Sequence, residues 1–261
     1  MGIALKEELK KILRISDLNF SNVFQNFNFE IEAEQSSINC ILCFDNSASV
    51  LLKIIGNVED NFQGEINIDN EKSIAVYIPA EASSLPWLNV EENVKFVINN
   101  SKYSVDISNE QIKNIIESVG LKGYEKHFPD NRSLGFRFRI SLARALVLRP
   151  ALILIDNSFH KIDDETKFEL YDLLKEVSSI YNVSVLLAST DINEAIYLSE
   201  NIYLVKGEKA EIIERINLKE EWRKLSEENR NNRQIILKEK ILKSFLVNDV
   251  NNILESQIRD K

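Results

Sequence analysis

Apolar and polar residues follow two different repeats along the chain, and together they predict alternating strands and helices. Near the start, apolar residues alternate over residues 12–16 and 27–33, between turns rich in Asn and Ser, which is typical of antiparallel strands. The short apolar run 38–42 is followed by the polar turn Asp45-Asn46-Ser47 and by a helical repeat over about 48–55. This order predicts a strand, a loop and a helix in succession.

Helical repeats dominate the middle of the chain. One extends over about 89–126, and a second helix is expected from about Ser133 to the residue before Pro150. The apolar run 151–155 has the length of a strand and is typical of a strand buried on both faces of a parallel sheet. The remaining expected elements are strands at 64–68, 74–78, 183–188 and 202–205, and helices at 163–180 and 191–199.

This alternation predicts an α/β fold with a mainly parallel core sheet, antiparallel strands at the start and a helical insertion. We expect a charged N-terminal segment at 1–11 and one domain at 12–217, with its helical subdomain at about 85–145. Residues 218–261 form a charged, helical tail without glycine or proline. The tail is interpreted either as solvated helices packed on the domain or as a docking element.

Composition narrows the classes of function. Hydrophobic residues make up 44% of the 261 residues, enough for a substantial core, and the formal net charge of -9 disfavours binding to nucleic acid. No apolar run approaches eighteen residues, and the N-terminus reads as a charged segment instead of a signal peptide. The expected compartment is therefore the cytoplasm.

Cys40 and Cys43 are the two cysteines, and they lie three residues apart. A redox or metal pair is one interpretation, but no second pair exists to complete a zinc site. We interpret them as two small buried residues in and just after a strand.

Four segments resemble the ABC ATPase family. Residues 140–150 read ISLARALVLRP and residues 151–156 read ALILID; in the family, such a helix follows the signature motif and such a strand ends in the Walker B aspartate. Residues 85–90, LPWLNV, and 193–198, NEAIYL, are similar to the importer branch for nitrate, sulfonate and taurine. The resemblance implies an ABC-type phosphate-loop nucleotide-binding domain with a mainly parallel core sheet, an antiparallel strand layer and a helical subdomain.

The resemblance places the phosphate loop at residues 42–50, where most of the chemistry is missing. Such a loop needs the pattern G-x-x-x-x-G-K-[ST], because glycines let backbone N–H groups approach the phosphates, lysine balances their charge and the hydroxyl holds Mg²⁺. Leu42 and Ser47 replace the two glycines, and Ala48 replaces the lysine. Ser49 keeps the hydroxyl, Asp45 adds a carboxylate, and the loop ends at Val50.

Three further positions that the family uses for hydrolysis are altered. The glutamine that senses the nucleotide metal falls on Ala80, the glutamate that activates water falls on Asn157, and the switch histidine falls on Thr190. An amide cannot accept a proton as a general base at neutral pH. The chain is therefore expected to lack ordinary ATP hydrolysis.

Other positions of the family are kept or point to partners. In the signature, Ser133 and Gly135 are kept, but Leu134 is bulky where a neighbouring subunit's γ-phosphate would lie. Asp163 stands where the loop that links two subunits keeps an aspartate. Leu85, Pro86 and Trp87 lie in the region that contacts a permease in the family.

Two residues leave alternatives open. Asp156, together with Ser49, is interpreted as a remaining metal site or as a carboxylate that local backbone donors satisfy at the end of a strand. Trp87 either packs within the helical insertion or touches a membrane partner.

The expected function is a catalytically degenerate ATP-binding subunit of an importer, paired with an active ABC ATPase and an ABC permease on the inner face of the cell membrane. No cofactor is expected to bind tightly to this chain, although Mg-ATP can be shared at a heterodimer interface. The alternatives are a soluble regulatory or scaffold protein that reuses the fold, and a weakly active ATPase.

Overall fold

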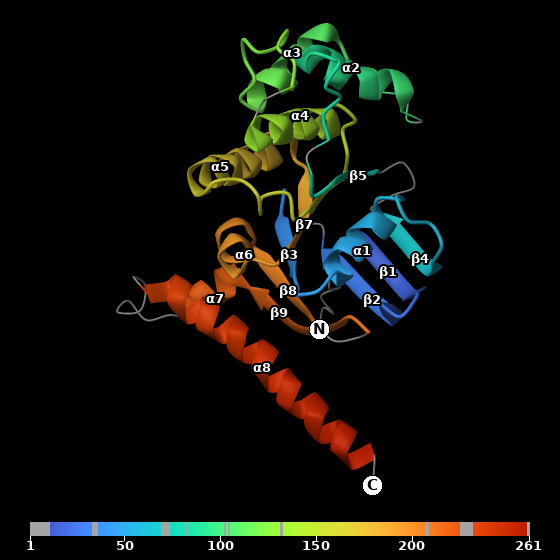
Figure 1. The fold of residues 1–261 in the computed structure, drawn as a ribbon, viewed down its shortest axis with the longest axis vertical. Helices are drawn as coiled ribbons and strands as arrows, with labels where there is room; N and C mark the ends of the chain where they lie inside the picture. Colours follow the sequence, from blue (N-terminus) through green and yellow to red (C-terminus); the bar gives the residue numbers. More distant parts are fainter. Residues whose placement is uncertain are drawn as a thin grey trace, which may run out of the picture.

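The computed structural model describes residues 11–32, 36–68, 74–81, 83–101, 103, 105–130, 133–206, 209–224 and 232–259. Of the predicted segment 1–11, only Lys11 is among them, and Arg132 of the signature also lies outside the described residues. Two sheets and a cluster of helices make up the molecule (Figure 1).

The central sheet has six strands in the order β5-β6-β7-β3-β8-β9. The first five strands run parallel, and β9 pairs antiparallel with β8 at the edge, so the predicted mainly parallel sheet is confirmed. The strand bounds are β3 Ile38–Leu42, β5 Ala75–Ile78, β6 Leu152–Asp156, β7 Ser184–Ser189, β8 Asn201–Lys206 and β9 Glu211–Asn217.

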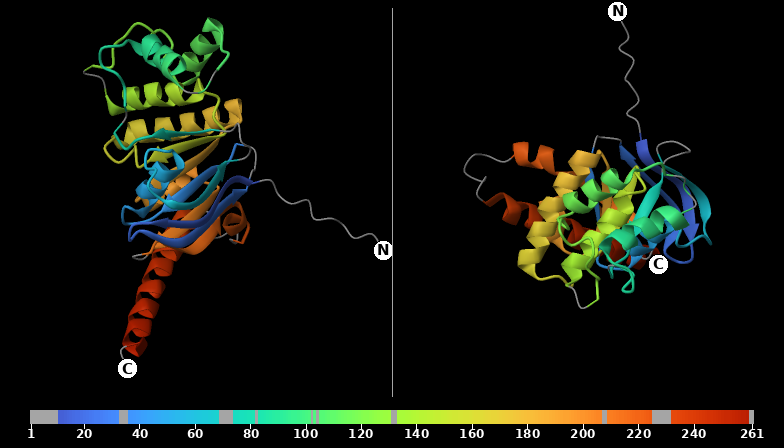
Figure 2. Two further views of the ribbon diagram at one scale, coloured as in Figure 1. Left: turned by 90° about the vertical axis from the view of Figure 1, so that its right-hand side faces the viewer. Right: turned by 90° about the horizontal axis from the view of Figure 1, so that it is seen from above.

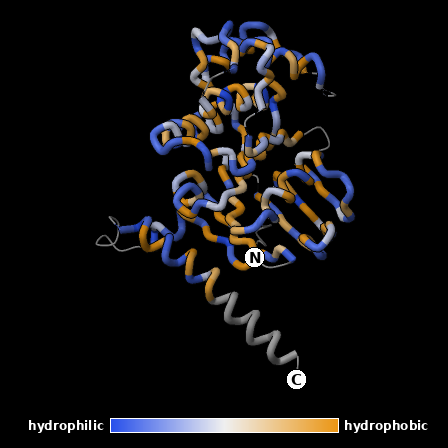
Figure 3. Tube along the Cα trace, viewed as in Figure 1, coloured by the Kyte–Doolittle hydropathy of each residue, from blue (hydrophilic) through white to orange (hydrophobic). Residues whose placement is uncertain are grey.

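The second sheet is antiparallel, has the order β2-β1-β4, and lies beside the central sheet with α1 (Ser47–Ile55) between them (Figures 1 and 2). Its strands are β1 Lys11–Phe20, β2 Phe24–Glu32 and β4 Gln63–Ile68. Buried side chains of β1, β2 and α1 form one hydrophobic core with side chains of the central strands. Figure 3 shows that hydrophobic stretches follow the strands of both sheets, as burial of their faces requires.

The remaining helices are α2 Val90–Asn100, α3 Asn109–Ser118, α4 Leu134–Leu146, α5 Asp164–Tyr181, α6 Ile192–Leu198, α7 Leu218–Lys224 and α8 Arg233–Arg259. Helices α2, α3 and α4 gather at one end of the molecule, and α8 extends from the other end (Figure 1). No helix among the described residues is long and apolar enough to span a membrane.

The sequence pattern misplaced two features. The helical repeat expected over 89–126 is two helices, because Ser108 caps α3 with a capping box and the positive φ angles of Gly120 and Gly123 break the chain after it. Strand β9 was not expected, because its apolar residues alternate irregularly with charged ones and the strand is half-exposed at the sheet edge.

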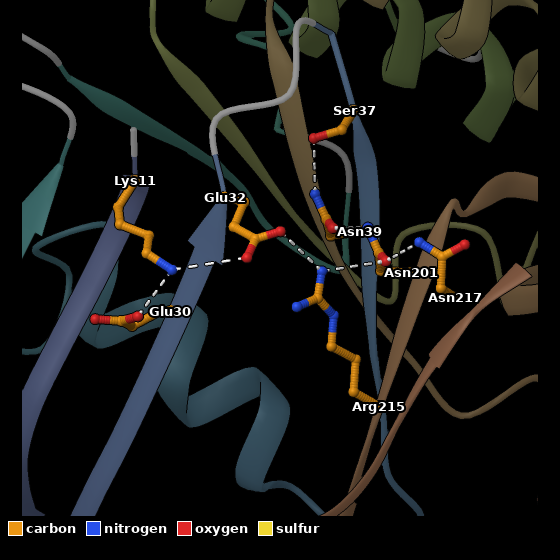
Figure 4. Close-up of polar contacts among 8 residues, drawn as sticks. All are labelled: Lys11, Glu30, Glu32, Ser37, Asn39, Asn201, Arg215 and Asn217. Carbon is orange, nitrogen blue, oxygen red and sulfur yellow. Dashed lines mark hydrogen bonds and ion pairs between the residues drawn. The ribbon is translucent and has the colours of Figure 1, made fainter. Parts of the chain in front are cut away.

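A chain of polar side chains ties the two sheets together (Figure 4). On the antiparallel sheet, Glu32 lies between Lys11, at 3.8 Å, and Arg215 of β9, at 3.3 Å. Arg215 also reaches the amide oxygen of Asn201 at 3.5 Å, and Asn201 in turn donates to Asn39 of β3 at 3.1 Å. Asn39 and Asn201 are buried, so this network fixes β3, which leads into the phosphate-loop position, against β8.

Candidate nucleotide site

The phosphate-loop position lies where β3 ends and α1 begins, as the sequence predicts. Leu42, at the first glycine position, is fully buried, and α1 begins at Ser47, at the second. Within residues 42–49, all of which the structure describes, no residue has a positive φ angle. The backbone of this loop therefore no longer requires glycine, which is consistent with the side chains found there.

The Asp45 side chain places a carboxylate inside the phosphate-loop position. Its Oδ1 accepts hydrogen bonds from the backbone N–H of Ser47, at 2.7 Å, and from the Ser47 hydroxyl. Ser47 is the first residue of α1, and the helix N-terminus is where backbone N–H groups and the helix dipole favour a negative charge. A carboxylate of the chain itself thus takes up donors that a phosphate would need.

The neighbouring positions are closed by packing. The Ala48 methyl group, at the lysine position, is 3% exposed and lies in the core between the two sheets. On the outer side of the loop, the Phe44 ring contacts the Phe245 ring of α8 with 4.7 Å between centroids. This contact shows that the tail packs on the domain, at the phosphate loop, up to this point of α8.

Asp156, at the end of β6, is satisfied by two side-chain hydroxyls. Its Oδ2 accepts from Ser49 Oγ at 2.7 Å and from Tyr77 OH at 2.6 Å. Burial and the hydrogen bond to Asp156 raise the pKa of Tyr77, so Tyr77 stays a donor. The sequence interpretation named backbone donors, which was wrong: the donors are side chains, and Tyr77 was not anticipated because it is 79 residues away in the sequence.

The residues present are a poor fit for a metal ion held by this chain alone. Ser49 and Asp156 do lie together, but the hydrogen bond between them uses the oxygens that would face the ion. Mg²⁺ needs near-octahedral oxygen ligands and usually takes several of them from substrate phosphates. No group of three or more His, Cys, Asp or Glu side chains suited to a metal occurs in the described part of the chain.

Asn157 adopts a left-handed conformation, with φ 44°, and its N–H donates to the Ala188 carbonyl at 2.9 Å. Asn tolerates this conformation better than most residues, so the backbone itself favours an amide here. Thr190 is exposed between β7 and α6. Ala80 is half-buried, and the ion pair between Glu81 and Lys161, at 2.8 Å, links its segment to the one that follows Asn157.

The kept residues of the signature each have a role in folding. Ser133 caps α4 by accepting from the Phe136 N–H at 3.2 Å. A Cβ at Gly135 would lie 2.6 Å from Cγ2 of Thr166, so glycine allows α4 to approach α5 closely. Asp163 caps α5, and the hydrogen bond from the Thr166 N–H lowers the pKa of its carboxyl.

The segment with Leu85, Pro86 and Trp87 is held by one buried amide. Asn93, which is fully buried, accepts from the Leu85 N–H at 2.8 Å and donates to carbonyls of Leu85, Leu88 and Asn89. Trp87 is 69% exposed on this rigid turn. It therefore does not pack within the helical subdomain, and its contact with a membrane partner stays a prediction.

We expect Asn93→Ala to lower the free energy of unfolding by about 1 to 2 kcal/mol, because the backbone groups of the turn lose their buried partner. Trp87 should become more mobile, measured as a fall in fluorescence anisotropy in a Trp222→Phe background. Asn100→Ala is the control, because within the described part of the chain this exposed amide on the same helix donates to the Phe96 carbonyl alone, at 2.8 Å. Unchanged anisotropy in Asn93→Ala would contradict the assignment.

The described geometry brings together only part of the predicted site. Ser49 and Asp156 meet, and Gly135 lies against Thr166 of α5, whose N–H donates to Asp163. The signature on α4 and the phosphate loop at α1 lie in different parts of the molecule (Figure 1). Cys40 and Cys43 are both buried free thiols, and burial raises the pKa of each, as expected for packing residues.

The central sheet, the strand–loop–helix at residues 38–55, the antiparallel sheet and the helical subdomain define the class of ABC-type nucleotide-binding domains. Residues 48–160 match the family described as ABC transporter. The aliphatic sulfonates import ATP-binding protein SsuB of Bacillus anthracis is 33% identical over 196 residues, which cover 73% of this chain and 76% of that protein. SsuB 1 of Xanthomonas axonopodis pv. citri is 32% identical over 175 residues, 63% of this chain and 68% of that protein.

Solved structures agree on the fold. The cbiO1 protein of Clostridium perfringens, part of the ABC transporter complex cbiONQ, superposes with a TM-score of 0.71 at 18% identity, over 92% of this chain and 99% of that one. The bacterial ABC transporter cassette MJ0796 gives a TM-score of 0.64 at 22% identity, over 79% and 98%. The chain belongs to the ABC transporter family, as an ATP-binding subunit of the importer type.

Proposed function

We propose that this chain is a catalytically degenerate ATP-binding subunit of an ABC importer, which pairs with an active ATPase and a permease and transmits or restrains their motion. One observation carries the proposal: the Asp45 carboxylate is hydrogen-bonded to Ser47 at the N-terminus of α1, where the phosphates of ATP would bind. A second carboxylate or phosphate cannot use the same donors.

The negative charge of Asp45 disfavours the binding of ATP phosphates to this loop. At about 4 Å and an effective dielectric constant of about 20, each like-charge contact between Asp45 and a phosphate costs on the order of 4 kcal/mol. The position of the lysine that would offset the phosphate charge is taken by Ala48, which is buried. Since each 1.4 kcal/mol is about tenfold in affinity, a micromolar site would fall to millimolar or weaker.

The residues that would split ATP are also unsuited to it. Asn157 is no general base, Thr190 is no proton carrier, and Ala80 cannot contact a metal. Asp156 is engaged by Ser49 and Tyr77. These positions, taken together with the loop, support a subunit that performs no hydrolysis of its own.

In a heterodimer with an active ATPase, this chain would contribute its signature residues to one ATP site. In the ABC ATPase family, two subunits form a head-to-tail dimer. An active partner's phosphate loop would therefore face Ser133 and Gly135 of this chain. One shared Mg-ATP would bind there, while the Asp45 loop faces the partner's signature without nucleotide. The exposed Trp87 turn supports a contact with the permease, and this arrangement would hold the chain on the cytoplasmic face of the membrane.

Ala48→Lys should not restore ATP binding or turnover. The new side chain would start from a buried position between the two sheets, and Asp45 would remain as a nearer counter-ion than any phosphate. The measurement is isothermal titration with Mg-ATP beside a phosphate-release assay, with Val58→Lys as the control, because Val58 is 61% exposed. Micromolar binding by Ala48→Lys alone would contradict the role given to Asp45.

Co-purification tests the pairing. The chain is tagged in its native cell, membranes are solubilised gently, and the proteins that accompany it in stoichiometric amounts are identified. An ABC ATPase with intact motifs and a permease are the expected result. A soluble partner alone, or none, would overturn the importer role and leave a regulatory protein that has kept the fold.

A further inference from the structure

A cavity of about 300 Å³ lies between α5, α6 and the start of α8, outside the nucleotide site. Its walls combine aromatic rings with carboxylates. The rings and carboxylates are Phe168, Tyr171, Tyr197, Asp164, Asp191 and Glu194.

Three aromatic rings form one wall. The Phe168 ring stands edge-on to Tyr171, with 5.7 Å between centroids, and to Tyr197, with 5.1 Å. The ammonium group of Lys175 lies 3.9 Å from the centroid of the Tyr197 ring. This ring therefore already accepts a cation from the chain itself, as the negative face of an aromatic ring does.

Glu194 is a buried carboxylate with free acceptor capacity. It is 4% exposed, and its Oε2 accepts from Tyr171 OH at 2.8 Å. Its Oε1 makes no hydrogen bond of good geometry within the described residues. Burial raises the pKa of Glu194, although the hydroxyls of Ser189 and Tyr171 oppose the rise. A cation in the cavity would compensate a charge that burial otherwise destabilises.

The lining carries more negative than positive charge. It contains three carboxylates against one lysine, Lys167, whose ammonium lies 3.4 Å from Asp164. The other nearby lysines are engaged elsewhere, Lys175 on the Tyr197 ring and Lys238 on the amide oxygen of Asn193 at 3.4 Å. Asp191 caps α6, so its charge is fixed at the cavity wall.

From the buried Glu194 carboxylate, whose Oε1 lacks a hydrogen bond of good geometry within the described residues, the aromatic wall and the surplus of carboxylates, we infer that this cavity binds an organic cation, an alkylammonium or guanidinium group. The volume is at the lower end of that of ligand pockets and fits such a group with a short apolar stem. The stem would lie against the rings while the charged end faces Glu194. A free amine or a Lys or Arg side chain of a partner protein presents this same chemistry.

The test uses the full chain and NMR titration, followed through the ring signals of Tyr171 and Tyr197. The probes are n-butylammonium, free arginine and a Gly-Arg-Gly peptide, with n-butanol as the uncharged control. The expected result is saturable shifts from the cations and none from n-butanol, with affinity at least about tenfold weaker in Glu194→Gln. Glu65→Gln, an exposed carboxylate on β4, should leave the affinity unchanged.

The arms also separate the two sources of the cation. Tighter binding of the peptide than of both free cations would assign the cavity to a partner's side chain, and the reverse order would assign it to a small molecule. Tyr197→Leu provides a second variant if Glu194→Gln does not fold, and it too should weaken binding. Equal shifts from n-butanol and n-butylammonium, no shifts at all, or unchanged affinity in both variants would overturn the inference.

Discussion

Asp156→Ala in the isolated chain should lower the free energy of unfolding by about 3 to 4 kcal/mol, because two partly buried hydroxyls lose a charged acceptor at once. Ser49 and Tyr77 both donate to the same carboxylate oxygen. Through these two bonds Asp156 joins α1, β5 and β6. Denaturant unfolding followed by circular dichroism measures the change.

Asp156→Asn is the matched control, because the amide oxygen can still accept from both hydroxyls. It should recover most of the lost stability, and neither variant should alter a nucleotide-dependent signal. The structural role would be contradicted if Asp156→Ala were as stable as the parent chain. It would also be contradicted if Mg²⁺ stabilised the parent and not Asp156→Asn.

Gly135→Ala should lower the free energy of unfolding by about 2 to 3 kcal/mol, in the range typical of overpacked sites. The added Cβ would lie 2.6 Å from Cγ2 of Thr166, and a β-branched side chain on a helix has little rotameric freedom to move away. The backbone of α4 or α5 must therefore shift. Thermal or denaturant unfolding is again the measurement.

Thr166→Ser removes the obstructing methyl group and keeps the hydroxyl. In the Gly135→Ala background it should restore most of the stability, while alone it should change stability little, which makes the pair a double-mutant cycle. Strict additivity of the two substitutions would show that the contact between α4 and α5 is not the reason for glycine here.

The elements of the fold could be predicted from the sequence where burial is continuous. Strand β3 is buried along its whole length and apolar at four of its five residues, so Ile38–Leu42 could be located to the residue. Strand β9 is half-exposed at a sheet edge, and its pattern carries too little of this signal. The repeat over 89–126 hid the break between α2 and α3, because both helices place their apolar residues toward the same core.

The site could be predicted less completely, because its contacts join residues that are distant in sequence. The replacement of the phosphate-loop lysine by Ala48 is visible in the sequence. The capture of the Ser47 donors by Asp45 depends on the loop backbone, and Tyr77 reaches Asp156 from another strand of the sheet. Likewise, the left-handed φ of Asn157 gives a reason for its identity that no pattern of residues contains.

The retained and the altered residues fit one account. Ser133, Gly135, Asp163 and Asp156 each stabilise the fold, so they are constrained whether or not ATP is split. Ala48 packs in the core between the two sheets, whereas Thr190 is exposed and Ala80 is half-buried, and under the proposal none of the three side chains takes part in hydrolysis. A subunit that works by contact with partners needs the residues that stabilise the fold, and it does not need the residues that perform hydrolysis.

The most direct test of this account is the affinity of the isolated chain for Mg-ATP, measured by isothermal titration and accompanied by a single-turnover assay. The account predicts a Kd of about 1 mM or weaker, which corresponds to about 4 kcal/mol of binding free energy, and no turnover. Micromolar binding, together with turnover that Asp156→Asn abolishes, would contradict it and identify an active ATPase with unusual motifs.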